Sequence, residues 1–172
     1  MTIYTLGHST RELTEFVAIL HAYKIDLLVD VRSVPRSRHT PQFNLDSLAT
    51  ELLKSGIGYL HLEKLGGLRH TTKSSTNLGW HNTSFRGYAD YMQTPEFTAG
   101  IDELLGLATD KTVAIMCAEA VPWRCHRSLI GDALLVRGHE VIDIFDEHKT
   151  QPEKLTDFAR VEGLTITYPG EQ

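Results

Sequence analysis

The chain has 172 residues, of which 41% are hydrophobic, and its formal net charge is -5. This length predicts one domain with one packed core. The negative charge argues against general binding to nucleic acid, which needs a basic face, and leaves open a local basic cleft. The sequence shows no signal-peptide pattern and no apolar stretch near the roughly 18 residues of a membrane helix, so we expect a cytoplasmic protein without a membrane partner.

Predicted strands and helices alternate along the chain. A β-rich segment at 3–6, a helical apolar pattern at 13–20 and a continuous apolar run at 27–31 form a βαβ unit, which predicts parallel strands. Ser9 or Thr10 is the expected cap of that first helix. Further helices are predicted at 45–54, 88–92, 95–107 and 126–136, with a weak helix between 152 and 160. Further strands are predicted at 59–62, 112–116, 141–144 and 164–168.

The fold expected from this order is a single α/β domain over residues 1–172, built in three layers. Its sheet would be mostly parallel, with about five strands and helices on both faces. Residues 63–86 are polar and lack apolar periodicity, which predicts a long functional loop that could act as a lid. Residues 146–172 are predicted to form a peripheral C-terminal element.

Two cysteines flank the strongest candidate for a site. Cys117 directly follows an apolar strand, and Cys125 precedes the start of the next helix. Ligands of parallel sheets bind beyond the carboxyl ends of the strands, and a helix N-terminus favours both thiolates and bound anions. We therefore predict Cys117 as a reactive group, with ligand-binding roles for Arg124, Cys125, His126 and Arg127. The alternative is that both cysteines are buried packing residues.

Three further side chains are candidates for proton transfer. Asp30 ends a buried strand, Glu119 lies two residues beyond Cys117, and His8 follows the first strand. All three occupy positions at or just beyond strand ends, where a ligand would bind. The structural alternative for Asp30 and Glu119 is an ion pair with an arginine.

Arginines after the second and third strands are candidates for anion binding. Arg32, Arg36 and Arg69 could bind phosphate oxygens through two donors at once, whereas Arg38 is interpreted as solvated. Gly66-Gly67 would allow the backbone to approach a ligand closely, and the aromatic residues at 85–91 suit either base stacking or core packing. The spacing of cysteine and histidine matches no standard zinc pattern, so we expect neither a metal nor a cofactor.

Several of these motifs together resemble the domain-of-unknown-function 488 family. They are Gly7-His8-Ser9-Thr10, Asp30-Val31-Arg32 through Arg38, Pro41 through Asn44, Leu65-Gly66-Gly67, Phe85 through Tyr88, and Cys117 through Arg127. The resemblance runs to about residue 145 and implies a small α/β domain without an established reaction. A fainter resemblance is to rhodanese-type sulfurtransferases, whose cysteine also follows a strand. The longer loop here, with Glu119 and Pro122, departs from that plan.

Three functions follow as hypotheses. The first is an enzyme that binds and processes an anionic ligand, phosphate-bearing, nucleotide-like or derived from nucleic acid, at the carboxyl ends of the strands. The second is a thiol-based enzyme for sulfur transfer or redox chemistry, with Cys117 as nucleophile and Cys125 as resolving thiol. The third is a non-catalytic module that binds a nucleotide or nucleic acid.

Overall fold

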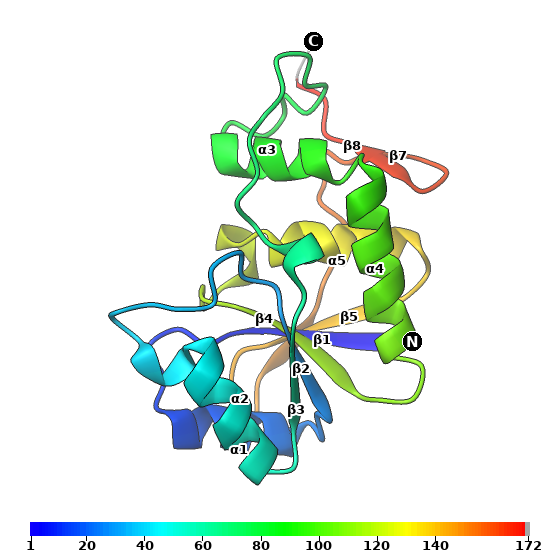
Figure 1. The fold of residues 1–172 in the computed structure, drawn as a ribbon. Coiled ribbons are helices and arrows are strands. Elements are labelled where there is room, and N and C mark those ends of the chain that lie inside the picture. Colours follow the sequence, from blue (N-terminus) through cyan, green and yellow to red (C-terminus); the bar gives the residue numbers. More distant parts are fainter. Residues whose placement is uncertain (171–172) are drawn as a thin grey trace.

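A six-stranded sheet forms the centre of the computed structural model, which describes residues 1–170 (Figure 1). The strand order is β3-β2-β4-β1-β5-β6. The bounds are β1 (Thr2–Gly7), β2 (Leu27–Asp30), β3 (Gly58–His61), β4 (Val113–Cys117), β5 (Glu140–Ile144) and β6 (Thr150–Pro152). The first five strands are parallel, and β6 pairs antiparallel with β5. The predicted α/β fold with a mostly parallel sheet is confirmed.

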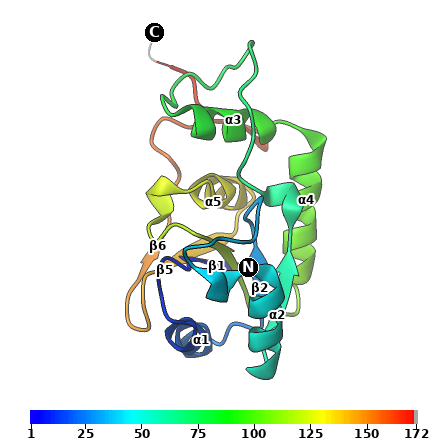
Figure 2. The same ribbon diagram turned by 60° about the vertical axis from the view of Figure 1, so that its left-hand side comes forward.

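Helices cover both faces of this sheet. Helices α1 and α2 lie on one face and α4 and α5 on the other, while α3 lies beyond α5 (Figures 1 and 2). The helix bounds are α1 (Leu13–Ala22), α2 (Leu45–Lys54), α3 (Thr83–Tyr91), α4 (Pro95–Leu107) and α5 (Arg127–Val136). Short 3-10 turns are η1 (Pro41–Phe43), η2 (Glu63–Leu65) and η3 (Pro122–Arg124). No helix within residues 1–170 is long and apolar enough to cross a bilayer.

Strand β4 is buried along its whole length, which explains why its sequence is a continuous apolar run. Its alternate residues Val113, Ile115 and Cys117 join the core beneath α4 and α5. Ala114 and Met116 join the separate core beneath α1 and α2. Successive side chains of a strand point to opposite faces, so a sheet covered on both faces needs apolar residues at every position. This alternation places the Cys117 side chain on the α5 face.

The chain after β5 differs from its prediction. The helix expected between 152 and 160 is absent from the described structure, and the strand expected at 164–168 lies outside the main sheet. There β8 (Thr165–Thr167) pairs antiparallel with β7 (Arg160–Glu162) in a separate hairpin. The helix is lost because Glu153 N–H continues the pairing with β5, and Thr156 binds Asp132 of α5. Of the predicted peripheral element, residues 171–172 lie outside the described part.

Two helix starts also differ from prediction. Neither Ser9 nor Thr10 caps α1, which begins at Leu13 after Glu12, and Ser9 adopts a left-handed backbone with φ 50°. Helix α3 begins at Thr83 rather than at residue 88, because the Asn82 side chain accepts hydrogen bonds from the backbone of the first turn. Pattern reasoning missed this start because the first turn is polar.

A single carboxylate binds the polar loop that precedes α3. Asp90 of α3 accepts hydrogen bonds from Ser75 Oγ at 2.6 Å, Asn77 Nδ2 at 2.7 Å and Thr72 N at 2.8 Å. Burial by itself would raise the pKa of Asp90, but these donors outweigh it and lower the pKa below its ordinary value. The loop therefore has a defined conformation against α3, and its action as a lid stays a prediction.

Candidate functional site

A cavity of about 480 Å³ lies where the carboxyl ends of β1, β2 and β4 meet. These strands are neighbours at the centre of the sheet, so the segments that follow them converge. Of the residues predicted from sequence, the cavity is lined by His8, Arg32, Arg36, Cys117, Glu119, Arg124, Cys125 and His126. Loop and α3 residues complete the wall, among them Gly67, Leu68, Asn82, Ser84 and Phe85.

Cys117 lies at the end of β4 with its side chain 2% exposed, at the wall of this cavity. Arg127 Nε donates a hydrogen bond to Cys117 Sγ at 3.4 Å. Burial alone would raise the pKa of Cys117, but the Cys125 thiol, the charge of Arg127 and the backbone of Glu119 outweigh it and lower the pKa. The site therefore favours a Cys117 thiolate, which is the reactive form of cysteine.

Arg127 is the first residue of α5, and it is buried, with 1% exposed. From this position its side chain reaches Cys117. Its Nη2 donates to the backbone oxygens of Glu119 and Ala120, at 3.1 and 3.2 Å. These bonds orient the guanidinium, so that Nε faces the sulfur. The remaining nitrogen, Nη1, is buried and has no hydrogen-bond partner within residues 1–170. Arg127 does not line the cavity itself and acts on it through Cys117.

Cys125 and His126 lie at the other end of the segment that begins at Cys117 and leads into α5. The His126 Nε2–H group donates to Val31 O at 2.8 Å, which leaves Nδ1 as an acceptor 3.4 Å from Cys125 Sγ. Burial lowers the pKa of His126 to about 4, so its ring is neutral at physiological pH. Burial and the adjacent Cys117 raise the pKa of Cys125 well above its ordinary value. Within this pair, Cys117 is thus the thiol that loses its proton first, and Cys125 is the one that keeps it.

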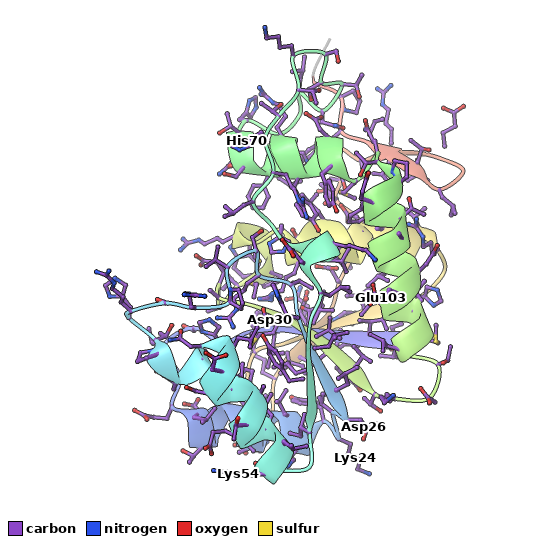
Figure 3. The ribbon with its side chains drawn as sticks, in the orientation of Figure 1. Lys24, Asp26, Asp30, Lys54, His70 and Glu103 are labelled. Atoms are coloured by element: carbon purple, nitrogen blue, oxygen red, sulfur yellow. The ribbon has the colours of Figure 1, made fainter. Side chains whose placement is uncertain are left out.

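A second polar network fixes the floor of the cavity beside β2. Asp30 lies in the middle of the molecule (Figure 3) and binds Arg32 Nη2 at 2.7 Å and Arg32 Nε at 2.9 Å. Arg32 also donates to Phe43 O at 2.7 Å and meets His8 Nε2 at 3.3 Å. These contacts leave one guanidinium N–H of Arg32 for a ligand. Asp30 itself lies behind Arg32 and does not line the cavity.

His8 is fixed by the same network. Its Nδ1 lies 2.8 Å from Ser9 O and its ring stacks on Phe43 with centroids 4.4 Å apart. Because Nδ1 faces a carbonyl oxygen, Nδ1 carries the proton and Nε2 accepts from Arg32. Burial lowers the pKa of His8, and the charge of Arg32 acts in the same direction. In this arrangement the His8 ring is neutral and its two nitrogens are occupied.

The mouth of the cavity carries the exposed charges. Arg36 and Arg124 line it and are both exposed, as is Glu119. Val34 and Leu68, 54% and 74% exposed, add an apolar rim. An anionic ligand would therefore meet these two arginines before the buried sulfur.

Arg69 is another predicted ligand-binding residue that does not line the cavity. Its guanidinium lies 3.7 Å above the Tyr91 ring and donates to Gly66 O and Glu63 O. Gly67 and Gly7 are in close contact with other parts of the protein, although Gly67 also lines the cavity. A Cβ on Gly67 would lie 2.6 Å from His126 Nδ1, and one on Gly7 would lie 1.6 Å from Glu119 O.

Sequence reasoning missed two residues that contact this network or lie behind it. Tyr59 donates its hydroxyl to Asp30, which the pairing of β3 beside β2 could have suggested. Glu153 lies behind α5, against the backbone of Gly131, and both its carboxyl oxygens are buried without a partner within residues 1–170. Burial and the acids Asp143 and Asp132 raise the pKa of Glu153 to about 9. No sequence pattern marks it.

Comparison with known proteins gives one family. The domain of unknown function DUF488 matches residues 12–134, more than half of the chain. The chain belongs to the DUF488 family. The matched range includes both cysteines and Arg127, whereas His8 and Glu153 lie outside it. No curated protein and no solved structure matches the chain.

The family assignment confirms the resemblance seen in the sequence and carries no reaction with it. The chemistry of this DUF488 domain must therefore be argued from its own residues. Within residues 1–170, no three His, Cys, Asp or Glu side chains cluster so that they could hold a metal ion. What the site offers is an arginine-bound thiol at the wall of a cavity, with a second thiol beside it.

Proposed function

We propose that the protein is a thiol-dependent enzyme in which Cys117 attacks a small substrate that carries an anionic group. The observation that carries this proposal is the hydrogen bond from buried Arg127 Nε to Cys117 Sγ, 3.4 Å long, at the cavity wall. A cysteine that only fills space needs no buried cation at its sulfur. A guanidinium there stabilises the thiolate, which is the nucleophile in cysteine chemistry.

The anionic part of the substrate follows from the mouth of the cavity. Arg36 and Arg124 are exposed there, whereas Arg32 and Arg127 are buried and most of their guanidinium N–H groups bind protein partners. A substrate whose charge rests between the two exposed arginines can place its reacting atom toward Cys117. The cavity volume of about 480 Å³ is typical of sites for small molecules.

The rate at which iodoacetamide alkylates Cys117, measured against pH, tests the thiolate. The Cys125→Ser variant isolates the reaction of Cys117, and Cys117→Ser in turn reports any reaction of Cys125. Because Cys125 also assists the thiolate, the wild type is followed in parallel, with the labelled peptide identified by mass spectrometry. We expect half-maximal reactivity of Cys117 in the wild type below the ordinary thiol value of about 8.5.

Replacing Arg127 separates the proposed cause from general reactivity. Arg127→Lys keeps a positive charge but loses the fixed fork of donors, so the midpoint for Cys117 should move to higher pH. A wild-type midpoint at or above the ordinary value would overturn the proposal. Far-ultraviolet circular dichroism of each variant shows that the fold is retained.

A further inference from the structure

We propose that Cys125 is the resolving thiol of a dithiol exchange, whose substrate is a low-molecular-weight disulfide that carries an anionic group. Cys117 would open this disulfide, and Cys125 would then release the half that remains bound. The inference rests on the proposed function, because it needs a reactive Cys117. It goes further in naming the bond that is attacked and the residue that completes the reaction.

The first support is that one residue binds both sulfurs. Arg127 donates its side-chain Nε–H to Cys117 Sγ at 3.4 Å and its backbone N–H to Cys125 Sγ at 3.5 Å. Both cysteines line the same cavity, with 2% and 6% of their surfaces exposed. A group attached to Cys117 in this cavity therefore lies within the surroundings of Cys125.

The second support is the hydrogen-bond acceptor that His126 offers to the Cys125 thiol. Because His126 Nε2–H is bound to Val31 O, Nδ1 presents a lone pair 3.4 Å from Cys125 Sγ. Gly67 packs against the same edge of the ring, where a Cβ would lie 2.6 Å from Nδ1. The Cys125 thiol has one proton to donate, and this lone pair can accept it. His126 can therefore take that proton when Cys125 reacts.

The different partners of the two sulfurs give the order of the reaction, because Arg127 Nε binds Cys117 Sγ and His126 Nδ1 lies at Cys125 Sγ. The Cys117 thiolate attacks one sulfur of the substrate RSSR, the S–S bond breaks, and RS⁻ leaves and takes a proton from solvent. Cys117 is now a neutral mixed disulfide, and the Cys125 S–H donates to His126 Nδ1. A sulfur lone pair of Cys125 is then free to face the mixed disulfide.

In the second step the Cys125 thiol passes its proton to His126 Nδ1 as Cys125 Sγ attacks Cys117 Sγ. The bond between Cys117 and the substrate sulfur breaks, and the second half leaves as RSH with the proton that Cys125 gives up. The substrate disulfide has gained two electrons and two protons, and the dithiol has become a Cys117–Cys125 disulfide. A low-molecular-weight thiol restores the dithiol by the same exchange in reverse.

The experiment uses 5,5′-dithiobis(2-nitrobenzoate), a disulfide with a carboxylate on each half, and the full-length wild type and variants. We expect the wild type to release both halves of the probe and to end as an internal disulfide without adduct, by intact mass. Cys125→Ser should release one half and keep the other on Cys117. Cys125→Ala serves as a second variant in case the serine hydroxyl disturbs the site.

The outcomes separate this inference from the proposed function. If the wild type keeps the probe on Cys117 as stably as Cys125→Ser does, Cys125 does not resolve and the inference is overturned, while a reactive Cys117 stands. If Cys117 fails to react in the wild type, both the inference and the proposed function are overturned. Cys117→Ser should show no rapid release, because the protonated Cys125 thiol reacts efficiently only with a disulfide that is already held beside it. Rapid release from that variant would also contradict the assigned order.

Discussion

Glu153 provides the sharpest test of the electrostatics around α5. Its two carboxyl oxygens are buried without a partner within residues 1–170, against the backbone of Gly131. Burial first, and then the nearby acids Asp143 and Asp132, raise its pKa from 4.5 to about 9. The folded protein therefore retains a proton that the unfolded chain releases at neutral pH. This proton makes the stability of the fold depend on pH.

The sign and size of the dependence follow directly. The contribution of Glu153 to stability is fully present below about pH 4.5 and falls as the pH rises, until the folded carboxyl ionises near pH 9. Each pH unit within this window lowers the free energy of unfolding by about 1.4 kcal/mol. At pH 7 the loss is on the order of 3 kcal/mol. A Glu153→Gln side chain does not titrate and removes this part of the slope.

Urea unfolding of the wild type and of Glu153→Gln, measured at several values between pH 5 and pH 9, is the assay. We expect the variant to gain stability relative to the wild type as the pH rises. A smaller slope should remain in the variant, because burial also raises the pKa of Asp132 and of Asp143. Glu162→Gln makes the same change on exposed β7 and controls for the loss of a surface charge. Parallel curves for the wild type and Glu153→Gln would refute the reasoning.

Three other substitutions probe the loop, the turn and the mouth of the cavity. Asp90→Asn should destabilise the protein by about 1–3 kcal/mol and speed amide exchange in the preceding loop, because several donors lose a charged acceptor; unchanged exchange would contradict this. Gly7→Ala should destabilise the protein by more than about 2 kcal/mol in urea unfolding, because the added Cβ would collide with the backbone of Glu119. Gly106→Ala has open space in α4 and should stabilise the protein by up to about 1 kcal/mol. Arg124→Gln should lower the ratio of the rates at which iodoacetate and iodoacetamide label Cys117 by about two- to threefold. Arg38 lies outside the cavity, so Arg38→Gln should leave that ratio unchanged.

The sequence by itself predicted the parallel part of the sheet and the position of Cys117 at its edge. Buried strands such as β4 are continuous apolar runs, and a run of this kind is a local property that needs no knowledge of neighbours. Because parallel strands end at one edge, the segments after them had to converge, and Cys117 and His8 do lie together there. Helices α2 and α4 also have the predicted bounds, since their apolar spacing and terminal residues are local signals.

Only the tertiary structure decided what each charged residue does. The arginines at 32, 69 and 127 looked alike as candidates for anion binding, yet they bind a carboxylate, an aromatic ring and a thiol sulfur. Long charged side chains reach partners from distant parts of the chain, and burial without such a partner is costly. Glu153 lies far from Gly131 in sequence and meets it only because β6 pairs with β5. Hydrophobic periodicity is written locally in the chain, whereas the partner of a buried charge is set by which segments the fold brings into contact.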